Sequence, residues 1–281
     1  MARAMIGLDT IKLDQDFDYT YLSLGAGVQS SALLVLACTD ARIPKPDVAI
    51  FADTGDEPQY VMDYLEILRK YAETYGVNIV TAQKGVLSED TLAKEKFVDV
   101  PLHTMHADGT RGMLRRHCTG LYKIFPINKK VRELLGYKPR QRMKHRVRAM
   151  LGISTDEIQR MKESRVKWVM HSFPLIDLGI SRNDCYKIME KAGLPTPQKS
   201  ACVYCPYHSD SYWQWMKDEQ PTEFARAVDF DEAIRNKTMR GEEQPAYVHK
   251  SCVPLKDANF DPNDPNQVDL FNNECEGMCG V

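Results

Sequence analysis

Hydrophobic and polar positions follow two alternating periods along the first eighty residues, which predicts strands and helices in turn. Apolar segments at 17–24, 47–52 and 77–81 predict three strands, and the almost unbroken second one is typical of a parallel strand buried on both faces. Between them, apolar residues recur at helical spacing up to about Cys38 and again over 60–75. This order predicts an α/β fold with a doubly wound parallel sheet.

The pattern becomes less regular after residue 86. Asp and Gly breakers indicate a long loop or lid over 86–112, near the carboxyl ends of the strands. Helical periodicity returns over 121–135, with Pro126 as a kink or a restart. The remaining pattern predicts a strand at 166–171 and helices at 181–192, 211–217 and 223–236.

The first predicted strand ends in a turn rich in glycine and serine. Gly25 and Gly27 let the backbone approach an anion closely, and Ser30 and Ser31 add hydroxyl donors at the start of a helix, whose N–H groups favour negative charge. The turn is not a Walker A loop, because no Gly-Lys-Ser/Thr follows, and Ser30 replaces the third glycine of the dinucleotide fingerprint. We interpret it as a site for the pyrophosphate of a nucleotide.

Charge and hydropathy limit which nucleic-acid or membrane partners the protein can have. The 281 residues include 37 basic and 39 acidic side chains, for a formal net charge of −2, so any contact with nucleic acid must be local. There is no apolar run of transmembrane length, and the first twenty residues lack the apolar stretch of a signal peptide. We expect a cytoplasmic protein without a membrane partner.

Eight cysteines in a reducing compartment favour metal binding or catalysis over disulfides. Cys202 and Cys205 form a C-x-x-C motif, and with Cys118 they make a set of three thiolates that suits an iron-sulfur cluster or zinc. In the zinc alternative, His208 or His117 would be the fourth ligand. A [4Fe-4S] cluster held by three thiolates would leave one iron open.

Acidic residues follow the second predicted strand. Asp53 stands where ligands bind in parallel sheets, and it is a candidate for Mg²⁺ or a nucleotide hydroxyl. Asp56 and Glu57 are equally suited to the start of the next helix, where negative charge is favourable.

The turn resembles the PP-loop of the ATP pyrophosphatase superfamily, whose Ser-Gly-Gly-x-Asp-Ser pattern aligns with residues 25–30. Gly27 and Ser30 match, while Gln29 stands where the family has Asp. Further motifs follow in the order of the phosphoadenosine phosphosulfate reductase-like branch with a C-x-x-C iron-sulfur motif. They are Asp53-Thr54-Gly55-Asp56-Glu57, Cys118-Thr119-Gly120-Leu121-Tyr122-Lys123-Ile124, the segment from Gly152 to Arg160, Phe173-Pro174-Leu175 and the segment from Cys202 to Pro206.

The resemblance implies an adenine nucleotide alpha hydrolase-like fold with a helical C-terminal region and an extended tail. We expect a PP-loop nucleotide-binding domain at 1–200, a helical cysteine-motif region at 201–255 and the tail at 256–281.

The resemblance also implies an ATP-dependent, adenylating sulfurtransferase that thiolates a nucleobase or nucleotide and needs ATP, Mg²⁺, a [4Fe-4S] cluster and a sulfur donor. Cys118, Cys202 and Cys205 would hold the cluster. The nucleotide would contact Ser23, Gly25, Ala26, Gly27, Gln29, Ser30, Ser31, Asp53, Lys123 and Arg160.

Two alternatives stay open. The tail contains Cys275 and Cys279, and sulfonucleotide (PAPS-type) reductases attack sulfur with a C-terminal cysteine; one tail cysteine could instead be the fourth cluster ligand. Cluster-containing reductases carry a tandem cysteine pair, whereas His117 precedes Cys118 here. Gln29 in the degenerate loop favours the other alternative, a noncatalytic ATP-binding assembly subunit.

Two basic patches suit a tRNA-like nucleic acid or the phosphates of a nucleotide. One comprises Arg111, Arg115 and Arg116, and the other runs from Lys138 to Arg148 with six Lys or Arg side chains in eleven residues. We expect both to flank the cysteines. A homodimer is left open.

Overall fold

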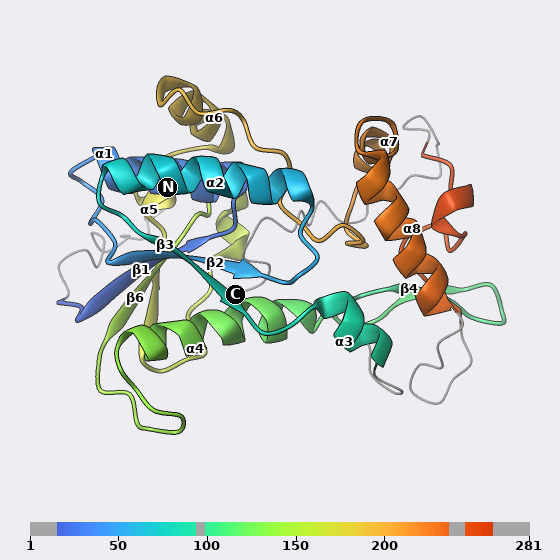
Figure 1. The fold of residues 1–281 in the computed structure, drawn as a ribbon, viewed down its shortest axis with the longest axis horizontal. Coiled ribbons are helices and arrows are strands. Elements are labelled where there is room, and N and C mark those ends of the chain that lie inside the picture. Colours follow the sequence, from blue (N-terminus) through green and yellow to red (C-terminus); the bar gives the residue numbers. More distant parts are fainter. Residues whose placement is uncertain (1–15, 94–98, 236–244, 261–281) are drawn as a thin grey trace, which may run out of the picture.

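The computed structural model describes residues 16–93, 99–235 and 245–260, and the tail with Cys275 and Cys279 lies outside these ranges. Five parallel strands form the main sheet in the order β3-β2-β1-β6-β7 (Figure 1). The strands are β1 (Tyr19–Leu24), β2 (Val48–Asp53), β3 (Ile79–Gln83), β6 (Val147–Leu151) and β7 (Val169–Ser172). The chain reverses direction across the sheet after β3, so β1 lies between β2 and β6. This confirms the predicted doubly wound fold, in which ligands bind where the strand order reverses.

Helices cover both faces of this sheet, as its two-sided hydrophobic strands require. On one face, α1 (Val28–Thr39), α2 (Gln59–Thr74) and α6 (Arg182–Lys191) share a core with Leu22 and Leu24 of β1. On the other face, α4 (Phe125–Leu134) packs Ile127 and Val131 against Tyr21 (Figure 1). The 3₁₀ helix η3 (Thr155–Arg160) lies between β6 and β7, and the short α5 (Pro174–Asp177) follows β7.

Strand β6 was not predicted from the sequence. Its first residues belong to the basic run 138–148, but the whole of β6 is buried, and Arg148 is only 6% exposed. The guanidinium carbon of Arg148 lies 4.3 Å from the centre of the Phe17 ring, which is a favourable cation–π distance. A charged side chain is thereby accommodated in a central strand.

A second, smaller core lies beside the main sheet (Figure 1). It contains a three-stranded antiparallel sheet in the order β5-β4-β8, made of β4 (His103–Met105), β5 (Arg111–Met113) and β8 (Ala246–Tyr247). The helical elements of this part are α3 (Leu87–Ala93), α7 (Asp210–Glu219), α8 (Pro221–Arg235) and the 3₁₀ turn η4 (Leu255–Asp257).

The segment 86–112 therefore differs from the predicted loop, because it contains α3, β4 and the start of β5. Leu87, Val100 and Leu102 pack in the second core with Trp213 and Phe230. The C-terminal region is helical as expected, while the predicted domain boundaries stay a prediction. In the described part of the chain, no helix is long and apolar enough to span a membrane.

Candidate functional site

The turn between β1 and α1 lies at the carboxyl end of β1, beside β6. Gly27 is the N-cap of α1, and Ser30 closes the turn: its hydroxyl donates to the Gly27 carbonyl at 3.1 Å and accepts from the Gly25 N–H at 3.2 Å. Ala26 adopts a left-handed backbone conformation with φ of 59°. The first turn of a helix has N–H groups without intrahelical partners, which suits an anion here. By contrast, Ser23 and Ser31 are buried in the core.

The end of β6 approaches this turn at backbone distance. A Cβ atom added to Gly152 would lie 2.7 Å from both the Cα and the N of Ser30, and 3.0 Å from the carbonyl carbon of Gln29. Only a residue without a side chain fits, so Gly152 permits the close packing of β6 on the first turn of α1. Gly152 begins one of the motifs recognised in the sequence, but its steric role is visible only in the structure.

Gln29 is buried and reaches the segment after β6. Its Nε2 donates to Ser154 Oγ and to Glu157 Oε2, both at 2.9 Å. The same Glu157 oxygen pairs with Arg160 Nη1 at 2.5 Å. Glu157 thus brings a carboxylate to the helix position where the PP-loop pattern has Asp. The predicted nucleotide ligands Gln29 and Arg160 both lie in this network.

The acidic segment after β2 forms a tight, buried turn. Asp53 Oδ1 accepts from the Gly55 N–H at 2.7 Å and so shapes the turn. Asp56 accepts from the Ser88 N–H and hydroxyl, each at 2.7 Å, and from the Tyr204 hydroxyl at 2.5 Å. Asp56 therefore ties α3 and the C-x-x-C loop to β2. It does not take the other role considered for it, at the start of a helix, because α2 begins only at Gln59.

The C-x-x-C loop packs against this turn. The Cys205 N–H donates to the Cys202 carbonyl at 3.0 Å, and the Val203 N–H donates to the Asp56 carbonyl at 2.9 Å. Cys202 Sγ lies 3.1 Å from Thr54 Oγ1. Cys118 immediately precedes the π-helix η2 (Thr119–Ile124), which continues into α4. All three cysteines are half-buried free thiols.

Lys123 of η2 interacts with the three cysteines and with Glu57. Its Nζ lies 3.5 Å from Glu57 Oε1, and the two side chains are 8% and 1% exposed. Burial alone would lower the pKa of Lys123, but Glu57 and Cys202, Cys118 and Cys205 raise it above its usual value. Lys123 is therefore a buried cation that interacts with all three thiols. The pairing of Glu57 with Lys123 was missed in the sequence, although both residues lie in family motifs.

Burial dominates the acidity of these thiols. It raises the pKa of Cys118 to about 11, with Cys205 adding to the effect and Lys123 and Arg116 opposing it. Burial and then the Glu57 carboxylate raise the pKa of Cys202, and burial raises that of Cys205. A positive group such as an iron centre would stabilise the thiolates in such surroundings.

A zinc ion and a [4Fe-4S] cluster need different arrangements of their protein ligands. Among residues 16–93, 99–235 and 245–260, no three His, Cys, Asp or Glu side chains are placed to share one metal ion. His208 Nε2 lies 3.0 Å from the Cys202 carbonyl oxygen, and its ring stacks on Tyr212. Each iron of a [4Fe-4S] cluster binds its own thiolate, so thiols around a cluster lie farther apart than those around one ion. Three free thiols supply donor atoms of the kind that such a cluster needs, and Cys205 interacts with both Cys118 and Cys202.

The two basic patches lie in different places. Arg116 of the first patch lies over the Tyr207 ring, 5.5 Å from its centre, and interacts with Cys118 and Cys205. The run 138–148 instead enters β6 at its amino end, where the Arg146 N–H donates to Asp18 beside the start of β1. The turn between β1 and α1 (residues 25–30), which we call the phosphate turn, lies at the carboxyl end of β1, the opposite end of the sheet. The expectation that both patches flank the cysteines is thus wrong for the second.

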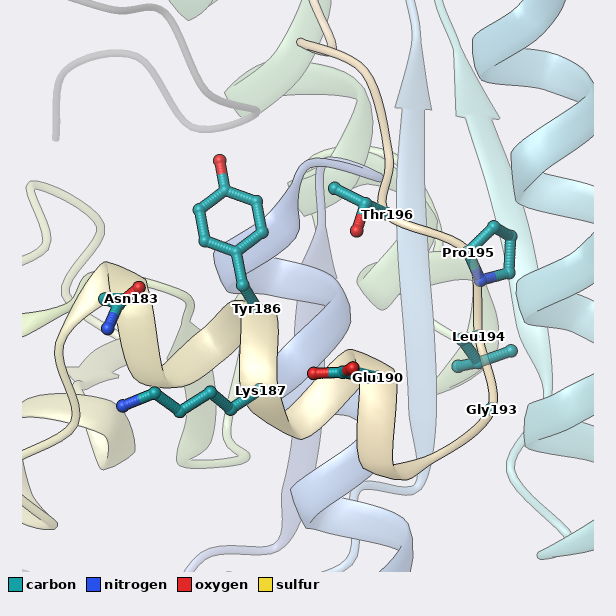
Figure 2. A pocket seen from close by; sticks show the side chains of 8 residues that line it. All are labelled: Asn183, Tyr186, Lys187, Glu190, Gly193, Leu194, Pro195 and Thr196. Carbon is teal, nitrogen blue, oxygen red and sulfur yellow. The ribbon is translucent and has the colours of Figure 1, made fainter.

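A hollow beside α6 is separate from this site. Figure 2 shows the side chains around it, and none of the predicted site residues lines it among the described part of the chain. Its lining comprises Asn183, Tyr186, Lys187, Glu190, Gly193, Leu194, Pro195 and Thr196. Beyond Thr196, the chain continues to the C-x-x-C loop.

The fold and the site define an α/β protein with a glycine- and serine-rich turn at the reversal point of a parallel sheet and a set of thiols at the same end. No family model matches the chain, and no curated protein matches it.

Similar solved structures include phosphoadenylyl-sulfate (PAPS) reductase from Candida auris in a phosphate complex. It has 16% identity and a TM-score of 0.40, over 64% of this chain and 76% of that one. Another is the U34-tRNA thiolase NcsA from Methanococcus maripaludis with its [4Fe-4S] cluster, with 14% identity and a TM-score of 0.44, over 96% and 83% of the two chains. Both TM-scores lie below 0.5, and we take the case for a function from the residues of this chain.

Proposed function

We propose that this chain is an ATP-dependent, adenylating sulfurtransferase that thiolates a nucleobase or nucleotide. One observation carries the proposal: the chain around the C-x-x-C motif is hydrogen-bonded to the phosphate turn and contacts the end of β2. Ser200 donates a hydrogen bond to the Gly25 carbonyl of the turn, and Thr54 at the end of β2 contacts Cys202.

Each part of the site has a chemical role in this proposal. The N–H groups at the start of α1 and the Ser30 hydroxyl bind the phosphates of ATP, and Asp53 orients Mg²⁺ or the nucleotide. The substrate oxygen attacks the α-phosphorus of ATP, the bond between the α and β phosphates breaks and pyrophosphate leaves. The oxygen can then leave as part of AMP when sulfur replaces it. Cys118, Cys202 and Cys205 would hold a [4Fe-4S] cluster, and an iron without a protein thiolate would supply a binding position for sulfur. Lys123 balances the negative charge of the thiolates.

A noncatalytic nucleotide-binding subunit is the second candidate, because Gln29 replaces the family's Asp and its amide is held by Ser154 and Glu157. Such a protein would bind ATP without releasing pyrophosphate. The reductase alternative depends on Cys275 and Cys279, which lie outside the described residues.

The test combines metal analysis with ATP turnover. Iron and acid-labile sulfide are measured in the anaerobically purified chain and in the Cys118→Ala, Cys202→Ala and Cys275→Ala variants, with Cys38→Ala as a control outside the site. We expect loss of the cluster in the first two variants and retention in the others.

Pyrophosphate release from ATP is then measured in the presence of candidate nucleobase acceptors, with Ser30→Ala as the inactive variant. Zinc, or no metal at all, would contradict the sulfurtransferase proposal. A cluster with ATP binding but without pyrophosphate release would favour the noncatalytic subunit.

A further inference from the structure

The segment before the C-x-x-C loop lies across the carboxyl ends of two neighbouring strands. Ser200 is 1% exposed, and its hydroxyl donates to the Gly25 carbonyl at the end of β1. Three residues later, the Val203 N–H donates to the Asp56 carbonyl beyond β2 at 2.9 Å. The loop is therefore fastened on one side to the phosphate turn and on the other to the turn after β2.

The Ser200 bond acts on a sensitive part of the phosphate turn. The Gly25 carbonyl belongs to the peptide that enters Ala26, whose φ of 59° is left-handed, and the Gly25 N–H is held by Ser30. A phosphate that orders this turn therefore also fixes the acceptor of the Ser200 hydroxyl. Because the site is buried, loss of the hydroxyl would leave the Gly25 carbonyl without this partner.

We propose that Ser200 is a positioning residue that couples nucleotide binding at the phosphate turn to the cysteine loop. Nucleotide binding holds the Gly25 carbonyl in place, Ser200 holds the loop to that carbonyl, and Cys202 and Cys205 become less accessible. Such coupling is reciprocal, so a loop that is held in place also favours nucleotide binding. The inference rests on the proposed function only in taking the turn as a nucleotide site.

The test follows the thiols rather than turnover. The full chain, freed of metal and reduced, is alkylated with iodoacetamide with and without Mg²⁺ and an ATP analogue that cannot be cleaved between the α and β phosphates. Rates at Cys202 and Cys205 are read by peptide mass spectrometry, and Cys38 in α1 is the internal reference. Calorimetry measures binding of the analogue separately.

Ser200→Ala is compared with Ser172→Ala. Ser172 also donates its hydroxyl to a main-chain carbonyl, that of Ala149 at 3.4 Å, but it lies in β7 away from the cysteine loop. We expect the analogue to slow alkylation of Cys202 and Cys205 in the wild type and in Ser172→Ala. In Ser200→Ala this slowing should be about fivefold smaller, the effect of one hydrogen bond.

Equal slowing in the wild type and Ser200→Ala would overturn the coupling and leave the proposed function standing. The same holds if the analogue binds in calorimetry without changing the alkylation rates. A wild-type chain that binds no analogue would overturn the coupling and the proposed function together.

Discussion

Replacing Gly152 with alanine tests the close packing between β6 and the phosphate turn. The new methyl group would lie 2.7 Å from two backbone atoms of Ser30, so either β6 or the start of α1 must move. Leu33 and Leu34 of α1 are fully buried, and the helix packs against α6, so it has little freedom to retreat. Overpacking of this kind costs about 1–3 kcal/mol. For a chain of this size, the melting temperature should fall by roughly 2–5 °C.

The same displacement acts on the N–H groups that would face the nucleotide phosphates. We expect Gly152→Ala to weaken ATP binding by about tenfold or more, because anion binding at a helix start depends on the geometry of the first turn. Thermal unfolding and calorimetric titration with Mg²⁺ and ATP measure the two effects. Gly120→Ala is the matched control, since an added Cβ there meets nothing within 4 Å. Unchanged stability and affinity in Gly152→Ala would refute the steric reasoning.

Three further predictions concern single side chains. Lys123→Met should lower the free energy of unfolding in urea by about 3 kcal/mol, because it leaves Glu57 as a buried unpaired charge. A double variant, Lys123→Met with Glu57→Gln, should regain stability, and a double variant that regains none would argue against the pair. Ala26→Val should destabilise the fold by about 1–3 kcal/mol, because a β-branched residue strains a left-handed backbone. Ala26→Gly should not destabilise it, so equal unfolding midpoints for the two variants would contradict the strain. Burial lowers the pKa of His103 to about 4 from 6.5, so the unfolded chain binds the proton more tightly. Stability should therefore fall as the pH drops from 6.5 toward 4, by up to about 1.4 kcal/mol per pH unit, and His103→Gln should flatten this part of the profile of unfolding free energy against pH.

The first three strands could be predicted because their apolar runs are uninterrupted and the helices between them keep a regular period. β6 could not, because Arg148 in its interior extends the basic run that precedes it. In the fold, the Arg148 guanidinium lies over the ring of Phe17, which precedes β1 and is far away in the sequence. Local periodicity contains no information about such a partner.

The candidate site was predictable where its chemistry is local. The glycine turn and the C-x-x-C motif are short patterns, and the structure shows Ser30 closing the first and Cys202 adjoining the end of β2. The pairing of Gln29 with Glu157 joins positions 128 residues apart, and the Ser200 bond to Gly25 joins positions 175 apart. Contacts between residues so far apart in the sequence are set by the fold and cannot be read from the spacing of residues in a motif.

The position of β6 also determines how this protein can emerge from the ribosome. β1 pairs with β6, and the adjoining residues Asp18 and Arg146 are 128 positions apart. At typical synthesis rates, the edge of β1 waits roughly 6–26 seconds for that neighbour, with apolar side chains and unpaired main-chain groups exposed. During this time β1, β2 and β3 can form only a partial sheet. Nascent chains that stop before residue 147 should therefore aggregate or bind chaperones, whereas chains that extend through the C-x-x-C loop should not.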